Sequence, residues 1–136
     1  KMIAELRAIA TDIGQPFFFG YPESLNEQIA AENMPAIYCV MPTGIGFSNF
    51  RFSNYQTTIF FADNIDPEAT DEAKFATIES CKDTAAKFLR RIKESGTLYY
   101  SNVTSTIFDF ELNIRCCGVA VSLTIRELRE TCNDLT

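Results

Sequence analysis

Asp109 and Glu111 are the two side chains whose types and spacing come closest to a catalytic pair. They stand two residues apart in a segment where polar and apolar residues alternate, so a strand would carry both carboxylates on one face. Paired carboxylates with different pKa values serve as acid, base or nucleophile in many hydrolases. A solvated strand face produces the same alternation, which Asn113 and Arg115 continue. A small enzyme that uses Asp109 and Glu111 stays open, although the pattern favours a polar strand surface.

The composition excludes most other catalytic machinery. The chain of 136 residues has no histidine, which is the usual general base near neutral pH and the commonest metal ligand. Ser-His-Asp and Cys-His arrangements and histidine-based metal sites are therefore impossible. The formal net charge of −6 argues against direct nucleic-acid binding, which relies on Lys and Arg. We expect no cofactor and no metal ion, and we interpret the chain as a non-enzyme.

Three further clusters have ordinary structural explanations. The acids within residues 63–72 lack the ligand spacing of a calcium loop and fit turns and helix caps. The glycine-rich residues 44–47 lack the lysine and threonine of a phosphate loop. No zinc-site or disulfide spacing connects the five cysteines, so we expect buried thiols at positions 39, 81, 116, 117 and 132.

Charge and hydropathy patterns also bear on partners. A basic cluster is interpreted as a solvated helix face or as a surface for a negatively charged partner: Lys82, Lys87, Arg90, Arg91 and Lys93. No apolar run approaches the ~20 residues of a membrane span, so no membrane partner is expected. The N-terminal segment is amphipathic and carries acids, so we do not expect a signal peptide either.

Apolar residues at helical spacing predict an N-terminal helix and a short second helix. Within 2–13 the apolar residues share one face, and Gly14 ends the helix. The second helix is predicted over 24–32, where Ser24 would cap the first turn and Glu27 would complete a capping box.

The longest helix is predicted from the Asp66-Pro67 pair to Gly96. An aspartate cap followed by proline at the first helical position is a strong start signal. One apolar stripe continues from Phe75 to Ile92, with acids early and bases late, as the helix dipole favours. We expect this amphipathic helix to cover one face of a sheet.

Apolar runs and alternation predict strands over 17–19, 36–41, 51–62, 98–100, 108–115 and 117–125. Residues 42–50 are predicted as a loop between two strands of a hairpin, and Ser101 with Asn102 as a turn. After Cys116 the apolar positions change from even to odd numbers. Such a change requires a bulge or a connecting turn, and Gly118 is compatible with either.

Together these elements predict one α+β domain over residues 1–136, with 127–136 as a frayed tail. Short connections imply a mostly antiparallel sheet of at least four strands, with the long helix packed on one face, and the domain also has an N-terminal helix. The other sheet face is predicted to be partly polar, and solvated or bound by a partner, because it would carry Asp109, Glu111, Arg115, Thr124 and Arg126.

The chain has more aromatic residues than the core of so small a domain easily hides. Phe47 and Phe50 lie in the predicted loop, and Tyr55 lies on the strand that follows. Exposed aromatic side chains on a protruding hairpin are a common form of assembly surface. The alternative, in which the loop folds back onto the core, stays open.

The order of elements resembles that of a known family. After the N-terminal helix and a hairpin, the strand ending in Thr-Ile-Phe-Phe-Ala-Asp (58–63) leads into one long helix, and the last strand carries Gly-Val before Val-Ser-Leu-Thr-Ile (121–125). Over residues 2–127 the chain is similar to the tail-terminator or tail-completion proteins of tailed bacteriophages, which are minor tail proteins.

The resemblance implies a structural virion protein rather than an enzyme. Such proteins form a ring, usually hexameric, at the head-proximal end of the tail, where they stop the tube and present a surface to the neck or connector. The implied partners are further copies of the chain, the tail tube protein and the neck protein. The implied location is the phage tail and neck, with the host cytoplasm during assembly.

A closed ring needs two different surfaces on each subunit that fit one another. The acids Asp109 and Glu111 and the bases Arg90 and Arg91 are candidates for complementary surfaces, and the aromatic loop 43–50 is a candidate for contact with a neighbour or the tube. A head-to-tail adaptor or neck protein, the small enzyme named above and a binding module unrelated to phages remain alternatives.

Overall fold

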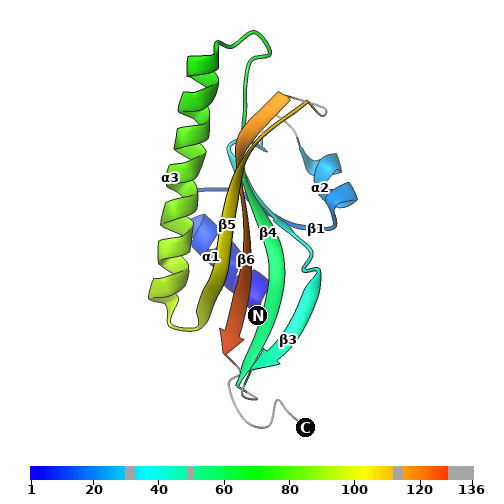
Figure 1. Cartoon of the computed structure of the whole chain (residues 1–136), viewed down its shortest axis with the longest axis vertical. Helices are drawn as coiled ribbons and strands as arrows, with labels where there is room; N and C mark the ends of the chain where they lie inside the picture. The colour runs from blue at the N-terminus through cyan, green and yellow to red at the C-terminus, as the bar shows by residue number, and fades with distance from the viewer. Residues whose placement is uncertain (30–32, 49–50, 112–114, 129–136) are drawn as a thin grey trace.

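A computed structural model of the chain describes residues 1–29, 33–48, 51–111 and 115–128, with the backbone alone at 26, 110 and 111 (Figure 1). In chain order the elements are α1 (Met2–Asp12), β1 (Phe17–Gly20), α2 (Pro22–Gln28), β2 (Ala36–Val40), β3 (Gly44–Ser48), β4 (Phe52–Asn64), α3 (Asp71–Ser95), β5 (Leu98–Glu111) and β6 (Arg115–Leu128).

One six-stranded sheet forms the centre of the fold. Its order is β1-β2-β4-β6-β5, and β3 also pairs with β4. The β1–β2 pair is parallel, and the other pairs are antiparallel. The prediction of an α+β fold with a mostly antiparallel sheet of at least four strands is therefore confirmed.

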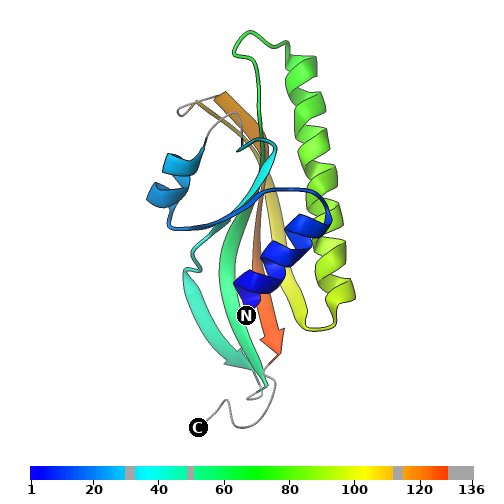
Figure 2. The same cartoon turned by 180° about the vertical axis from the view of Figure 1, so that it is seen from behind.

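Helices α1 and α3 cover the same face of this sheet (Figures 1 and 2). Phe88 of α3 lies fully buried against Phe61 of β4, with ring centroids 5.5 Å apart in an edge-to-face arrangement. Leu6 of α1 and Ile92 of α3 belong to the same core. Both predictions, a long helix on one face and an N-terminal helix, are confirmed.

The short helix α2 covers part of the opposite face. Its residue Leu25 is buried in a second apolar cluster with Tyr38 of β2 and Phe108 of β5. Beyond α2, this face carries polar side chains such as Thr58 and Ser122, whose hydroxyls share a hydrogen bond of 2.9 Å. The sheet therefore has one face that α1 and α3 cover over the larger core and one that α2 covers at one end only.

The long helix begins later than the sequence predicts. Asp66 instead forms a turn, because its carboxylate accepts from the Glu68 amide at 2.9 Å and its carbonyl accepts from the Ala69 amide. The N-cap of α3 is Thr70, whose hydroxyl accepts a 3.2 Å hydrogen bond from the Ala73 amide. The predicted end is confirmed, since Gly96 adopts a left-handed conformation with φ of +74°.

The predicted second helix is also displaced. It begins at Pro22, a residue type favoured at the first helical position, so Ser24 lies inside α2 rather than at its cap. The expected capping box of Ser24 and Glu27 is therefore wrong. The end of the predicted range, residues 30–32, lies outside the described residues.

The predicted loop 42–50 contains a strand, so the prediction is wrong there. Residues Gly44–Ser48 form β3, which pairs with β4 from Phe52 to Gln56. Ile45 and Phe47 alternate with less exposed glycines, and each exposes 65% of its surface. Glycine at every second position disfavours a strand by propensity alone, and tertiary pairing overrides that preference. Phe50 lies outside the described residues.

Strand β5 continues through the predicted turn at Ser101 and Asn102. A bulge between Ser101 and Thr104 interrupts the pairing with β6, and Asn102 adopts a φ of +54°. An extra residue in one strand exchanges its two faces. Asp109 consequently lies on the same face as α3, and Phe108 lies on the face of α2.

The residues that the sequence assigns to one polar face lie on both faces of the sheet. Asp109 and Arg115 lie on the side of α3, where Lys74 contacts Asp109. Thr124 and Arg126 lie on the other side, with the Arg126 guanidinium 4.3 Å from the centroid of the Phe52 ring. The predicted grouping is therefore wrong.

The change of parity near Cys116 lies at the connection between β5 and β6, where Glu111 pairs with Arg115 across residues 112–114. Residues 112–114 themselves lie outside the described part. Gly118 is in the interior of β6, opposite Ala62 of β4. Glu127 and Leu128, expected in a frayed tail, belong to β6, and residues 129–136 are not described.

Gly118 supplies a prediction about strand packing. A Cβ at this position would lie 1.9 Å from the Phe61 carbonyl oxygen, so β6 and β4 would have to separate. Gly118→Ala should reduce the free energy of unfolding by about 3 kcal/mol, as overpacking does. The matched control is Gly46→Ala, because its Cβ would meet only Asn54 at 4.0 Å. Equal urea midpoints for the two variants would contradict this account.

Candidate functional site

Asp109 takes part in an ion pair within the chain. Arg115 donates to both of its carboxylate oxygens, from Nη2 at 3.1 Å and from Nε at 3.3 Å. The Lys74 ammonium lies 3.8 Å from Oδ2. The hydrogen bond from Arg115 is the main reason that the pKa of Asp109 is lowered. Such a carboxylate stays ionised and suits an ion pair better than the role of general acid. The Glu111 side chain is outside the described part.

The two arginines of the basic helix end differ in their contacts. Arg91 donates to the Asp12 carboxylate, which joins the end of α3 to the end of α1. Arg90 is exposed on α3. Asp109 and Arg91 therefore have partners within the subunit, and their predicted role between subunits stays a prediction, as does that of Arg90.

The aromatic residues predicted to form an assembly surface separate into two groups. Phe47 is exposed on β3 together with Ile45, and we call these two residues the arm patch. Tyr55 lies opposite Ile45 in register but is half-buried against the core beneath α1. The predicted exposure therefore applies to Phe47 and does not extend to Tyr55.

A second exposed apolar surface lies at the other edge of the sheet. Ile107 of β5 exposes 61% of its surface and Phe75 of α3 exposes 54%, and the contact between Lys74 and Asp109 brings these parts of α3 and β5 together. We call Ile107 and Phe75 the edge patch. The sequence places Phe75 on the buried stripe and assigns no role to Ile107. The bulge in β5, which sets the direction of Ile107, gives no signal in the sequence.

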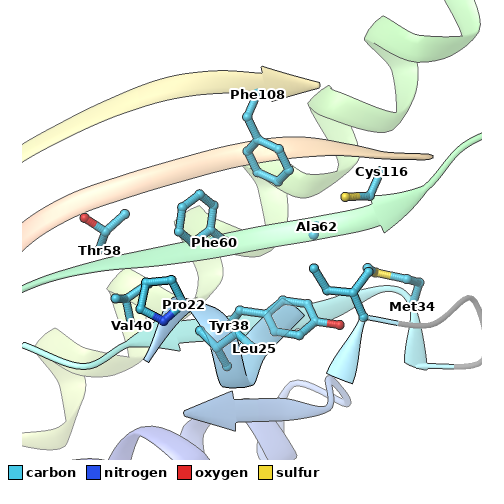
Figure 3. A pocket seen from close by; sticks show the side chains of 11 residues that line it. Pro22, Leu25, Met34, Tyr38, Val40, Thr58, Phe60, Ala62, Phe108 and Cys116 are labelled. Carbon is cyan, nitrogen blue, oxygen red and sulfur yellow. The ribbon is translucent and has the colours of Figure 1, made fainter. Parts of the chain in front are cut away.

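A cavity of about 390 Å³ lies between α2 and the sheet, and the sequence gives no indication of it (Figure 3). Its walls include Leu25 of α2, Tyr38 of β2, and Phe60 and Phe108, whose rings meet edge to face at 5.4 Å. Tyr38 stacks on Phe18 of β1 with centroids 5.1 Å apart. Burial, with a smaller contribution from Cys116, raises the pKa of Tyr38 to about 12.

Four of the five cysteines are buried, as predicted for core residues: Cys39, Cys81, Cys116 and Cys117. Burial is the main cause that raises the pKa of Cys39 to about 11 and that of Cys81 to about 12, so neither thiol forms a nucleophilic thiolate near neutral pH. Cys132 lies outside the described residues.

The described residues show neither a metal-ligand cluster nor a membrane-spanning helix. Within residues 1–29, 33–48, 51–111 and 115–128, no three acidic or cysteine side chains gather in a group that would hold a metal ion. None of the helices described there is long and apolar enough to span a bilayer.

No protein-family model matches the chain, and no curated protein matches it either.

The ion pair of Asp109 predicts a pH-dependent contribution to stability. A lowered folded pKa adds stability above the unfolded pKa of about 3.9, and the addition is lost as the pH falls through the folded value. Asp109→Asn should therefore reduce the free energy of unfolding at neutral pH, by less than about 1 kcal/mol because the pair is solvent-screened. The reduction should shrink as the pH approaches about 3.

Urea unfolding at several pH values measures this difference. The control is Asp83→Asn, which removes another exposed carboxylate on α3. A loss of stability in Asp109→Asn that is the same at every pH would show that the ion pair is not its cause.

Proposed function

We propose that the chain is a self-assembling structural protein of a tailed-phage virion, a tail terminator or tail-completion protein. In this role it forms a ring at the head-proximal end of the tail and joins the tail to the neck. The observation that carries the proposal is the pair of exposed apolar patches at opposite edges of one sheet. The arm patch lies on β3, and the edge patch lies on β5 and α3.

The positions of the two patches fit a heterologous interface. Strand β3 pairs with the edge of β4 that also carries β2, whereas β5 ends the sheet on the far side of β6. A subunit with one patch on each side can bind the next subunit in the same way, and closure of such contacts gives a ring. Exposed apolar patches at these positions are otherwise a cost to a soluble monomer.

Open strand edges support the same interface. In the described part of the chain, β3 pairs only with β4 and β5 only with β6, so each has an outer edge for backbone hydrogen bonds. Long open edges attract another strand unless they are protected. Pairing between β3 of one subunit and β5 of the next would bury both patches and both edges.

The virion location and the tube and neck partners rest on the resemblance in the order of elements. A head-to-tail adaptor would use the same two patches, and it remains the second candidate. An enzyme that uses Asp109 is less favoured, because the carboxylate is held ionised by Arg115 and Lys74.

A mixing experiment tests the heterologous interface. Phe47→Asp removes the arm patch and Ile107→Asp removes the edge patch, so each variant alone should be monomeric. An equimolar mixture should form a dimer that contains one of each, because one intact arm and one intact edge remain available. Native mass spectrometry measures the products, and Tyr21→Asp, which changes an equally exposed aromatic residue outside both patches, should assemble normally.

Two results would contradict the interface. The first is normal assembly by either single variant, which would show that its patch is not buried between subunits. The second is a mixture that stays monomeric although both variants keep the wild-type circular dichroism spectrum, which would show that the patches do not bind one another.

Electron microscopy of particles made without the protein tests the role in the virion. In a phage whose genome encodes the chain, deletion should produce overlong tails if the chain terminates the tube. Finished tails detached from heads would identify the adaptor instead. Normal particles would contradict both roles.

A further inference from the structure

The cavity between α2 and the sheet has the size of a ligand site. Its volume of about 390 Å³ lies in the range of roughly 300–1,000 Å³ that is common for such pockets. Figure 3 shows side chains from both sides pointing into it, with Leu25 and Tyr38 facing Phe60.

The walls of the cavity are almost entirely apolar. The described residues that line it are Pro22, Leu25, Ile29, Met34, Tyr38, Val40, Thr58, Phe60, Ala62, Phe108 and Cys116, none of which carries a charge at neutral pH. An ionised ligand would lose its hydration here without gaining an opposite charge. The walls therefore favour a neutral, apolar occupant.

One polar group in the wall has no partner. Tyr38 exposes only 3% of its surface, and among the described residues none forms a hydrogen bond with its buried hydroxyl. Figure 3 shows this hydroxyl directed along the cavity toward Met34. Thr58, the other hydroxyl in the wall, already shares a hydrogen bond with Ser122. Buried hydroxyls are normally satisfied, so the Tyr38 hydroxyl indicates an absent acceptor or donor.

We propose that this cavity binds a neutral, apolar small molecule that carries one hydrogen-bond acceptor, such as a carbonyl oxygen, for the Tyr38 hydroxyl. The ligand fills the space between Leu25 and Phe60 with its apolar part. Because the phenol of Tyr38 keeps its proton at neutral pH, it acts as the donor. The occupant therefore has the chemistry of a small ketone or ester rather than of a fatty acid.

The cavity is independent of the proposed ring. It opens on the face of α2, whereas Ile45 and Phe47 pair with Tyr55 and Ser53, which face the side of α1 and α3. A small molecule also fits the site better than a segment of a neighbouring protein, because the unsatisfied hydroxyl is fully buried inside the walls of one subunit.

The experiment uses the full chain and the neutral dye N-phenylnaphthylamine, which fluoresces in apolar surroundings. Wild-type protein should bind the dye, and butyrophenone, a ketone, should displace it. Ala62→Leu fills the cavity from β4 and should weaken dye binding at least about tenfold, whereas Ala76→Leu, on the exposed side of α3, should leave it unchanged.

The hydroxyl is tested by Tyr38→Phe with two competitors of equal heavy-atom count. This variant should weaken displacement by butyrophenone about fivefold, as expected for one neutral hydrogen bond, and leave displacement by pentylbenzene within about twofold. The anion phenylbutyrate should compete poorly with both proteins. Circular dichroism checks that each variant is folded, and Tyr38→Phe removes only an unsatisfied group.

Three outcomes would overturn the proposal. One is the absence of dye binding to the folded wild type. Another is an equal effect of Tyr38→Phe on both competitors. The third is dye binding that is present in the monomer and lost on self-assembly, because a second copy of the chain would then fill the cavity.

Discussion

Strand β4 is the constraint on which the rest of the fold depends. It pairs with β6 along its full length of 13 residues. Its other edge pairs with two strands in succession, with β3 along residues 52–56 and with β2 along residues 59–62. At the junction between them, the buried Thr57 hydroxyl donates to the Val40 carbonyl oxygen at 2.5 Å, and the Thr43 amide donates to the Gln56 carbonyl oxygen. These bonds join the connection between β2 and β3 to the edge of β4.

The properties of both sheet faces follow from that strand. Its odd-numbered residues, such as Ile59 and Phe61, pack beneath α1 and α3 and form the larger core. Its even-numbered residues, such as Phe60 and Ala62, face α2, which is too short to cover the whole face. The incomplete cover leaves both the cavity and a strip of hydroxyl groups. The same strand places β3 and β5 on opposite edges of the sheet, and their separation makes two distinct subunit contacts possible.

The sequence predicts the parts of this fold that depend on local periodicity. The stripe that ends at Ile92 and the stop at Gly96 are clear because a helix repeats its buried face over many turns. The helix start is ambiguous, because Asp66 and Thr70 are both good caps and only tertiary packing decides between them. The strand Gly44–Ser48 is not predicted from the sequence, because its glycines are typical of loops. It becomes a strand by pairing with β4.

The candidate sites are less predictable than the fold, because they depend on where strands bend. The bulge after Ser101 moves Asp109 to the side of α3, where Lys74 and Arg115 engage it. Alternation alone identifies Asp109 as polar and exposed but assigns it to the wrong face. The cavity brings together Leu25 and Phe108, which are far apart in the chain, so no local pattern predicts it.

The central claim is that two different patches of one subunit bind each other between copies. Native mass spectrometry of the wild-type chain over rising protein concentration tests it most directly. The account predicts one closed assembly with a fixed multiple of the chain mass, six by the resemblance in element order, that does not grow further. A monomer at every concentration, or a dimer as the final species, would contradict it, since a two-fold dimer uses a single self-complementary patch.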